Sequence, residues 1–355
     1  MQRSRVGKSE RLEDRICLTV SASVVDGDLI VEGDADGVVE VVAIGDGAYT
    51  VSDDGIVVAD LTDVDDDIYI QLEESVSAVD DTVLLDLGDE IVDRIYSDLG
   101  DGNNVLEITG GSIYRLTYRG GDDADSLLLD TIIESQAKLS LGDGANDVTI
   151  SGEVASLTIK GGDDNDLIAI TEEALITRNI SANLGDGDNS FSVAGEIDGR
   201  LEVTARDGAD TVTISEAAIL AESVKLSLGE GDNYTTISGA IDGKVDITGG
   251  DDNDTVEITS TAAIADSVFA KFGDGINTFT HDGSIEGDLN VTSLNEGDSF
   301  IVSDDAVVEG DTSLTPGEQF TGRFGHGGHG QHGHGHDMGG SRGGHGGRGG
   351  GFSFR

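Results

Sequence analysis

The sequence has very few cysteine, proline and aromatic residues, and it has no tryptophan. Its 355 residues include one Cys, one Pro, six Tyr and nine Phe. A single Cys excludes an intramolecular disulfide and a cysteine-based zinc cluster. The chain also has no apolar run of about 18 residues or more, which argues against a transmembrane helix. With so few aromatic residues, any core must be built mainly from Val, Ile and Leu.

Positive charge is scarce as well. The chain has 20 Lys and Arg against 71 Asp and Glu, a net charge of −51. Such a surface would repel phosphate, so nucleic-acid binding is excluded. Both ends of the chain are basic, with a net charge of +2 on residues 1–20 and +3 on residues 322–355. The net charge of residues 21–321 is therefore −56. A folded body with this charge needs a counter-charge, and a divalent cation is the simplest candidate.

Glycine is abundant, with 53 residues, and much of it lies in two alternating turn motifs. The motifs of the first kind are Leu99-Gly-Asp-Gly-Asn-Asn104, Leu141-Gly-Asp-Gly-Ala-Asn146, Leu184-Gly-Asp-Gly-Asp-Asn189, Leu228-Gly-Glu-Gly-Asp-Asn233 and Phe272-Gly-Asp-Gly-Ile-Asn277. The motifs of the second kind are Gly120-Gly-Asp-Asp-Ala-Asp125, Gly161-Gly-Asp-Asp-Asn-Asp166, Ala205-Arg-Asp-Gly-Ala-Asp210, Gly249-Gly-Asp-Asp-Asn-Asp254 and a degenerate Ser293-Leu-Asn-Glu-Gly-Asp298.

Short runs of alternating apolar residues follow each turn, which is the pattern of a half-buried strand. The first apolar residue after each turn recurs at a mean spacing of about 22 residues, as in Val148, Ile168 and Phe191. This period predicts an all-β fold, a right-handed parallel β-helix or β-roll solenoid with one coil per turn motif. A β-propeller stays open as an alternative, because two coils together match the length of one blade.

The segment Gly249-Gly-Asp-Asp-Asn-Asp-Thr-Val-Glu257 resembles the nonapeptide of the hemolysin-type calcium-binding repeat, the RTX family, as do Gly161 to Ala169 and Gly120 to Leu128. The resemblance covers residues 80–300 and implies calcium bound at the turns, each followed by a short strand. It departs from the family in having one motif per coil and no turn with all the signature residues. The candidate ligands are Asp122, Asp123, Asp125, Asp143, Asn146, Asp163, Asp164, Asp166, Asp186, Asn189, Asp207, Asp210, Asn233, Asp251, Asp252, Asp254, Asp274 and Asn277.

The chemistry of the turns agrees with this interpretation. Calcium takes six to eight oxygen ligands from carboxylates and carbonyls. Glycine permits positive φ, which turns carbonyl groups inward. Stacked coils would place one turn above the next, so that an ion bridges two coils and binding is coupled to folding. A plain Gly/Asp loop without metal is the alternative, since Asp and Asn favour tight turns in any case.

The chain divides into four predicted segments. Residues 1–25 form a basic export or sorting segment, and residues 26–79 form irregular first coils or an N-terminal cap. Residues 80–315 form the repeat solenoid, and residues 316–355 a disordered Gly/His-rich tail. Within residues 26–79, the acids from Asp63 to Glu74 approach an EF-hand loop, but Ile68 replaces the required Gly, so a turn before a strand is predicted.

The two ends carry further signals. Ser9 to Leu18 resembles the Leu-Glu-x-Arg-x-Leu-Leu N-terminal signature of exported proteins of planctomycete bacteria, which implies a secreted or cell-surface location. The tail concentrates imidazole groups that can chelate Zn²⁺, Ni²⁺ or Cu²⁺. A flexible glycine-rich tail without metal is equally compatible. The histidines concerned are His326, His329, His332, His334 and His336.

Together these features predict an exported, non-enzymatic structural or adhesive solenoid that binds several calcium ions. Its partner would be a cell-surface or matrix polysaccharide or protein. A carbohydrate-active β-helix enzyme of the lyase or epimerase type, or a non-catalytic module of one, is the second hypothesis. An acidic divalent-ion buffer is the third. No catalytic motif supports the enzyme, and His281 is the only His of the body.

Overall fold

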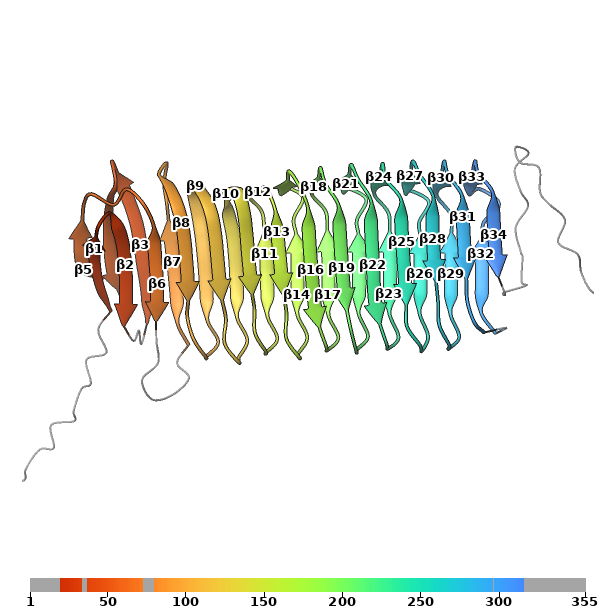
Figure 1. Cartoon of the computed structure of the whole chain (residues 1–355), viewed down its shortest axis with the longest axis horizontal. Coiled ribbons are helices and arrows are strands. Elements are labelled where there is room, and N and C mark those ends of the chain that lie inside the picture. Colours follow the sequence, from red (N-terminus) through yellow and green to blue (C-terminus); the bar gives the residue numbers. More distant parts are fainter. Residues whose placement is uncertain (1–19, 34–36, 73–79, 296, 316–355) are drawn as a thin grey trace, which may run out of the picture.

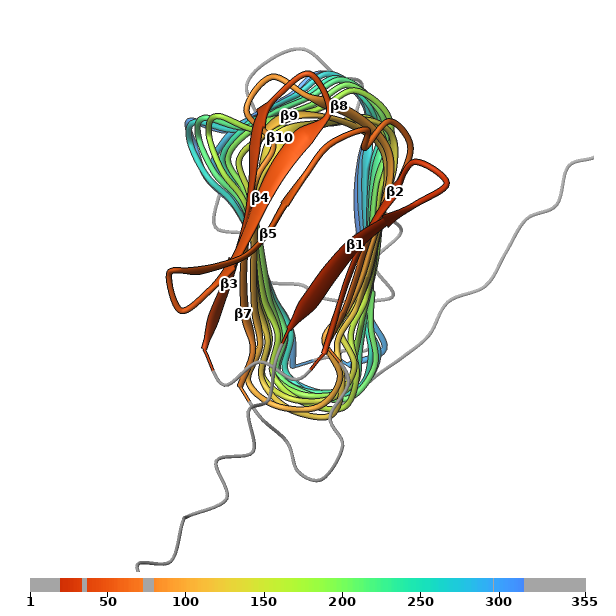
Figure 2. The same cartoon turned by 90° about the vertical axis from the view of Figure 1, so that its left-hand side faces the viewer.

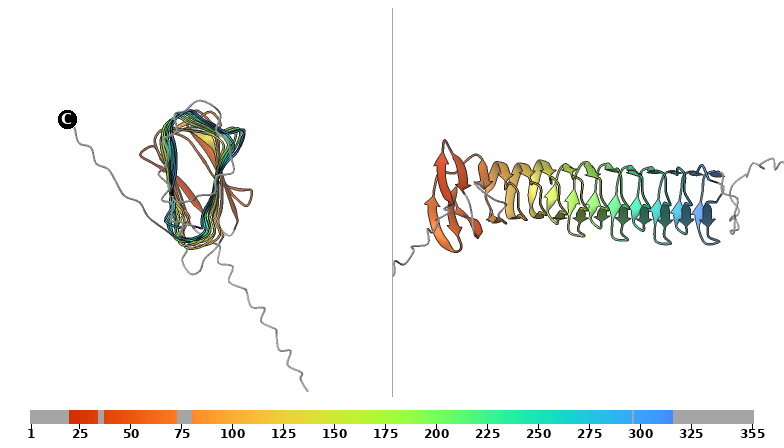
Figure 3. Two further views of the ribbon diagram at one scale, coloured as in Figure 1. Left: turned by 90° about the vertical axis from the view of Figure 1, so that its right-hand side faces the viewer. Right: turned by 90° about the horizontal axis from the view of Figure 1, so that it is seen from below.

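The computed structural model describes residues 20–33, 37–72, 80–295 and 297–315, and all their regular structure is β-strand. The strands stack into one elongated solenoid whose coils follow one another along the long axis (Figure 1). Viewed from its end, the solenoid is a flattened tube with two long sides (Figures 2 and 3). The solenoid is built from three ladders of parallel strands. We call them ladders A, B and C, in the order in which the chain passes through them within one coil.

Ladder A begins after each Gly/Asp turn and pairs coil to coil in register. Equivalent residues lie 20 to 23 positions apart, as in Val148, Ile168 and Phe191. Ladder A consists of β7 (Thr82–Asp86), the first parts of β9 (Val105–Arg119) and β10 (Ser126–Ser140), β11 (Asp147–Ile150), β14 (Leu167–Ile170), β17 (Ser190–Val193), β20 (Thr211–Ile214), β23 (Tyr234–Ile237), β26 (Thr255–Ile258), β29 (Thr278–His281) and β32 (Ser299–Val302).

Ladder B is made of two-residue strands at the corner opposite the Gly/Asp turns. It consists of β12 (Glu153–Val154), β15 (Leu175–Ile176), β18 (Glu196–Ile197), β21 (Ile219–Leu220), β24 (Ala240–Ile241), β27 (Ala263–Ile264), β30 (Ser284–Ile285) and β33 (Val307–Val308).

Ladder C leads back to the next Gly/Asp turn along the second long side. It consists of β6 (Ile68–Leu72), β8 (Ile91–Asp98), the later parts of β9 and β10, β13 (Leu157–Lys160), β16 (Ile180–Gly185), β19 (Leu201–Ala205), β22 (Val224–Gly229), β25 (Val245–Gly249), β28 (Val268–Lys271), β31 (Leu289–Thr292) and β34 (Thr312–Thr315).

Aliphatic side chains from all three ladders fill the interior. Each strand alternates buried and exposed positions, because successive side chains of a strand point to opposite faces. Leu106, Val148 and Val212 are fully buried equivalents in ladder A. The interior also holds polar groups, among them His281 and Thr235, which occupy ladder A positions that are aliphatic in most other coils.

Antiparallel strands close the N-terminal end (Figure 2). β1 (Ser21–Val25) pairs with β2 (Asp28–Gly33), and β3 (Val38–Gly45) pairs with β4 (Ala48–Asp53), which pairs with β5 (Ile56–Leu61). β2 and β3 then pair in parallel with β6 and β7, so the first coils grow directly from these hairpins. A cap of this kind protects strand edges that an open solenoid end would expose.

The structure confirms the parallel β-solenoid and its coil length, and the described chain contains no propeller blade of antiparallel strands beyond the N-terminal hairpins. The acidic stretch after Asp63 runs without helix into β6, so it is a turn before a strand, as predicted. The predicted N-terminal segment extended to residue 25, whereas β1 already begins at Ser21. The rest of that segment and the predicted tail lie outside the described residues.

Candidate metal-binding turns

The Gly/Asp turns stack along one edge of the solenoid, where ladder C ends and ladder A begins. The last residue of each turn points inward and is at least 96% buried. These residues alternate strictly between Asp and Asn from coil to coil, and we call them the Asp/Asn ladder. Its members are Asp81, Asn104, Asp125, Asn146, Asp166, Asn189, Asp210, Asn233, Asp254, Asn277 and Asp298.

The Asp/Asn ladder is a continuous chain of hydrogen bonds. The backbone N–H of each member donates to the side-chain Oδ1 of the member in the next coil. Asn146 N–H donates to Asp166 at 3.1 Å, and Asp166 N–H donates to Asn189 at 2.8 Å. The asparagine amides also donate, from Asn146 Nδ2 to Asp166 Oδ1 at 2.8 Å and to the Gly144 carbonyl at 2.9 Å. The buried backbone groups of the turns are therefore satisfied by side chains of neighbouring coils.

Residues at the first turn position alternate in step with the Asp/Asn ladder. From the turn of Asn104 onward, coils with Asn carry a buried Leu or Phe there, whereas coils with Asp carry Gly, Ala or Ser. The reason is steric at Gly161, because a Cβ there would lie 2.2 Å from Asp166 Oδ2 and 2.3 Å from the Leu184 carbonyl oxygen. Gly120 repeats the arrangement with Asp125 and Leu141. A carboxylate oxygen and a carbonyl oxygen of the next coil thus converge over each of these glycines.

Three aspartates of the ladder have a buried oxygen that accepts no hydrogen bond from the protein. Asp166, Asp210 and Asp254 each have an Oδ2 without a hydrogen-bond partner. Toward the two ends of the ladder a hydroxyl group supplies the missing donor. Tyr118 donates to Asp125 Oδ2 at 2.8 Å, and Ser293 donates to Asp298 Oδ2. The middle of the ladder therefore presents buried acceptors that require either a proton or a cation.

Burial makes these aspartates harder to ionise than usual. It disfavours the charged form, and the hydrogen bonds from the neighbouring Asn residues offset only part of this effect. Burial raises the pKa from 3.8 to about 6 at four members of the ladder: Asp125, Asp166, Asp210 and Asp254.

The other predicted ligands lie on the outside of the turns. Several of their carboxylates accept backbone N–H groups of the adjacent turn, as Asp143 does from Asp163 at 3.2 Å and Asp164 does from Gly144 at 3.2 Å. Asp186 is half-buried. The exposed members are Asp122, Asp123, Asp143, Asp163, Asp164, Asp207, Asp251, Asp252 and Asp274, and the buried ones are Asp125, Asn146, Asp166, Asn189, Asp210, Asn233, Asp254 and Asn277.

Glycine conformation in the turns differs between the two motifs. Four of the five turns ending in Asn place positive φ at their second and fourth positions, as at Gly142 and Gly144, and the fifth does so only at Gly275. The paired glycines of the Asp turns, such as Gly161 and Gly162, are not among the residues with positive φ, so the expected inward rotation of carbonyl groups does not arise from them. There, Gly161 provides space for the carboxylate of Asp166.

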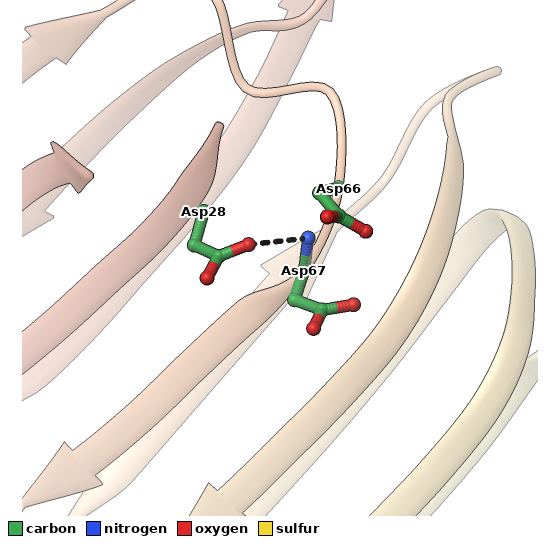
Figure 4. Close-up of side chains that lie close together, drawn as sticks. All are labelled: Asp28, Asp66 and Asp67. Atoms are coloured by element: carbon green, nitrogen blue, oxygen red, sulfur yellow. Dashed lines mark hydrogen bonds between the residues drawn. The ribbon is translucent and has the colours of Figure 1, made fainter. Parts of the chain in front are cut away.

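A separate acidic cluster lies in the N-terminal cap. Oxygens of Asp28, Asp66 and Asp67 lie within 4.8 Å of one another, and no other group of three His, Cys or acidic ligands in the described residues does so. Figure 4 shows Asp28 accepting the N–H of Asp67, with Asp66 beside them. The repulsion from Asp67 raises the pKa of Asp66.

Arg94 already neutralises part of this cluster. Its guanidinium lies 2.6 Å from Asp67 Oδ2, and its Nε donates to Asp67 Oδ1 at 3.2 Å. Tyr69 also donates to Asp67 Oδ2. Both oxygens of Asp67 are thus in use, which makes the cap cluster a less open cation site than the Asp/Asn ladder.

Sequence reasoning found most of the Asp/Asn ladder and missed its pairing rule. Asp81, Asn104 and Asp298 belong to it and were not among the predicted ligands. The alternation of Leu with Gly at the first turn position, in step with Asn and Asp, was the signal that could have shown an inward-facing ladder. Asp28, Asp66 and Asp67 were not predicted as ligands either, because Asp28 is distant in sequence from the other two. The five predicted tail histidines lie outside the described residues.

Comparison with protein-family models, curated proteins and solved structures found no match. In the part of the chain that the structure describes, no helix is long and apolar enough to cross a membrane.

Proposed function

We propose that the protein is an exported, non-enzymatic structural or adhesive solenoid whose stacked turns bind calcium between coils. The observation that carries the proposal is the buried, unpartnered Oδ2 of Asp166, Asp210 and Asp254. At Asp166 this oxygen converges with the Leu184 carbonyl, and hard oxygen pairs of this kind suit Ca²⁺. The resemblance of the turns to RTX repeats and the basic N-terminal sequence support the calcium and export parts of the proposal.

The residues that would hold the ions are Asp166, Asp210 and Asp254, together with backbone carbonyls of adjacent coils. A bound cation supplies the positive charge that lets these carboxylates stay ionised inside the protein. Binding stabilises the folded chain, because the unfolded chain does not bring two coils together. The continuous rod of coils in Figure 1 suits a structural or adhesive role.

The test replaces the three aspartates by the residue that occupies the intervening coils. In the variant Asp166→Asn, Asp210→Asn and Asp254→Asn, we expect calorimetry to show one calcium ion fewer for each carboxylate removed. We also expect a higher melting temperature than wild type in EDTA, since each amide can donate as Asn146 does. The charge-matched control carries Asp130→Asn, Asp198→Asn and Asp242→Asn, which are exposed and lie outside the Gly/Asp turns.

An unchanged calcium stoichiometry in the first variant would show that the three carboxylates are held protonated instead. If calcium bound to wild type without raising its melting temperature, the acidic ion buffer would be the better description. A loss of calcium in the control as large as in the variant would also point to the buffer.

A further inference from the structure

A cluster of lysines on the outer face of ladder C stands out from the acidic surface. The described chain has five Lys, and three of them, Lys225, Lys244 and Lys271, line one groove of about 440 Å³. They come from the neighbouring coils of β22, β25 and β28, which lie side by side in Figure 1. Residues up to 46 positions apart in the sequence are thus collected by the coil register.

Phe269 stands in the middle of this groove. In the register of ladder C its outward side chain is flanked by Asp246 of the preceding coil and Asn290 of the following coil. Phe269 is 39% exposed. Lys244 Nζ lies 5.3 Å from its ring centroid, a cation–π contact. An exposed aromatic ring at an outward strand position offers a flat apolar surface to a ligand.

The three lysines are not equivalent. Lys225 is paired with Glu202 at 2.6 Å, and Lys244 with Asp246 at 2.5 Å. Lys271 makes no ion pair with any described residue, and it borders the ring beside Thr248 and Thr292. The groove therefore combines an apolar ring, an unpaired ammonium group, and hydroxyl and amide groups from Thr248, Thr292 and Asn290.

We propose that this groove binds an acidic saccharide of the uronate class. The sugar ring packs on the exposed part of Phe269, the uronate carboxylate pairs with Lys271, and Asn290 and Thr292 hydrogen-bond to hydroxyl groups. Phe269, Lys271, Asn290 and Thr292 all line the groove. Long-range repulsion from the acidic body opposes binding, but salt screens it beyond about 10 Å at 0.1 M, whereas Lys271 acts at contact distance.

The test compares a short galacturonate oligomer with its methyl ester by titration calorimetry on the full-length protein. Both probes can pack on the ring, but only the free acid carries charge. We expect the free acid to bind about tenfold more tightly than the ester, because the ester cannot form the ion pair with Lys271, and tenfold corresponds to about 1.4 kcal/mol. The same loss of about tenfold is expected for Lys271→Ala, and Phe269→Ala should weaken both probes.

Lys160→Ala is the matched control. Lys160 occupies the same column of ladder C as Lys271, separated by Asn183, Thr204, Ser227 and Thr248, but no aromatic ring lies in the neighbouring column there. Its removal should leave the affinity unchanged. Equal binding of acid and ester, or an equal loss on Lys160→Ala and Lys271→Ala, would overturn the proposal. Circular dichroism checks that each variant is folded, and the outcome does not depend on whether the turns bind calcium.

Discussion

At the scale of single residues, the position of one carboxylate oxygen decides how each Asp coil is stabilised. Asp125, Asp166, Asp210 and Asp254 all use Oδ1 to accept the N–H of the preceding coil. They differ in the hydrogen-bond partner of Oδ2. At Asp125 the partner is a tyrosine hydroxyl, whereas Oδ2 of the other three has no protein donor. The same residue type is therefore a satisfied structural group in one Asp coil and a candidate ligand in another.

Removing the hydroxyl of Tyr118 tests this distinction. In Tyr118→Phe, Asp125 Oδ2 loses its donor and becomes a fourth unpartnered acceptor. We expect the unfolding free energy in EDTA to fall by about 1–3 kcal/mol, the cost of an unsatisfied buried group, and part of the loss to be recovered in calcium. Urea denaturation with and without calcium measures both.

Tyr96→Phe provides the comparison. Tyr96 donates to Asp98 Oδ2 at 2.9 Å, but both side chains are only partly buried, so water can replace the hydroxyl. We expect a smaller loss than for Tyr118→Phe and no effect of calcium on it. Equal losses for the two variants would mean that Asp125 gains no special stability from Tyr118.

At the scale of elements, the turns are shaped by close approach between coils as much as by their own backbone. Gly142 has φ of +85° and lies beneath the turn of the preceding coil, so that a Cβ would meet the Gly121 carbonyl oxygen at 1.9 Å. Glycine is therefore required at position 142 for two reasons. It can adopt the positive φ, and it lacks the Cβ that would clash with the preceding turn. The two requirements can be separated by experiment.

Gly142→Ala should destabilise the protein more than Gly45→Ala. Gly45 also has positive φ, at +99°, but no atom lies within 4 Å of the added Cβ. The change at Gly45 should therefore show the conformational cost alone, about 1–2 kcal/mol. At Gly142 the backbone of the neighbouring turn must also move. Thermal unfolding of the two variants measures the difference, and equal costs would show that the coils are less tightly stacked than described.

The strands themselves were predictable because ladder A repeats a simple alternating pattern. The second residue of each ladder A strand is buried in every coil from Val83 to Phe300, and this holds even where the residue is the polar Thr235. The N-terminal cap was less predictable, since β1 to β5 pair through antiparallel hairpins that break the period. The groove around Phe269 was not predictable at all, because its lysines are scattered in sequence and meet only through the register.

At the scale of the whole molecule, charge and pH control stability together. Four buried aspartates have a pKa raised from 3.8 to about 6 in the folded chain: Asp125, Asp166, Asp210 and Asp254. The folded state thus holds more protons than the unfolded state between these values. Their contribution is fully present below pH 3.8 and is lost as the pH rises through about 6.

We therefore expect the metal-free protein to melt at a lower temperature as the pH rises from about 4 to 7. Calorimetric scans in EDTA across this range measure the trend. The Asp166→Asn, Asp210→Asn, Asp254→Asn variant should show a shallower dependence, because three of the four groups are gone, while the charge-matched control should keep the wild-type slope. A variant and a control with the same slope would assign the trend to general repulsion among the surface carboxylates.

The sequence alone determined the repeat, the coil length and the parallel solenoid, because a period of about 22 residues with alternating apolar positions leaves few ways to bury the apolar side. It also located the turns that carry the acidic residues. Tertiary structure decided which of those acids face inward and which lack a donor, since that depends on what the neighbouring coil places above each carboxylate. It also brought Lys225, Lys244, Phe269 and Lys271 together. These features depend on contacts between residues about 20 positions apart in neighbouring coils. The register of those contacts is not written in a single sequence.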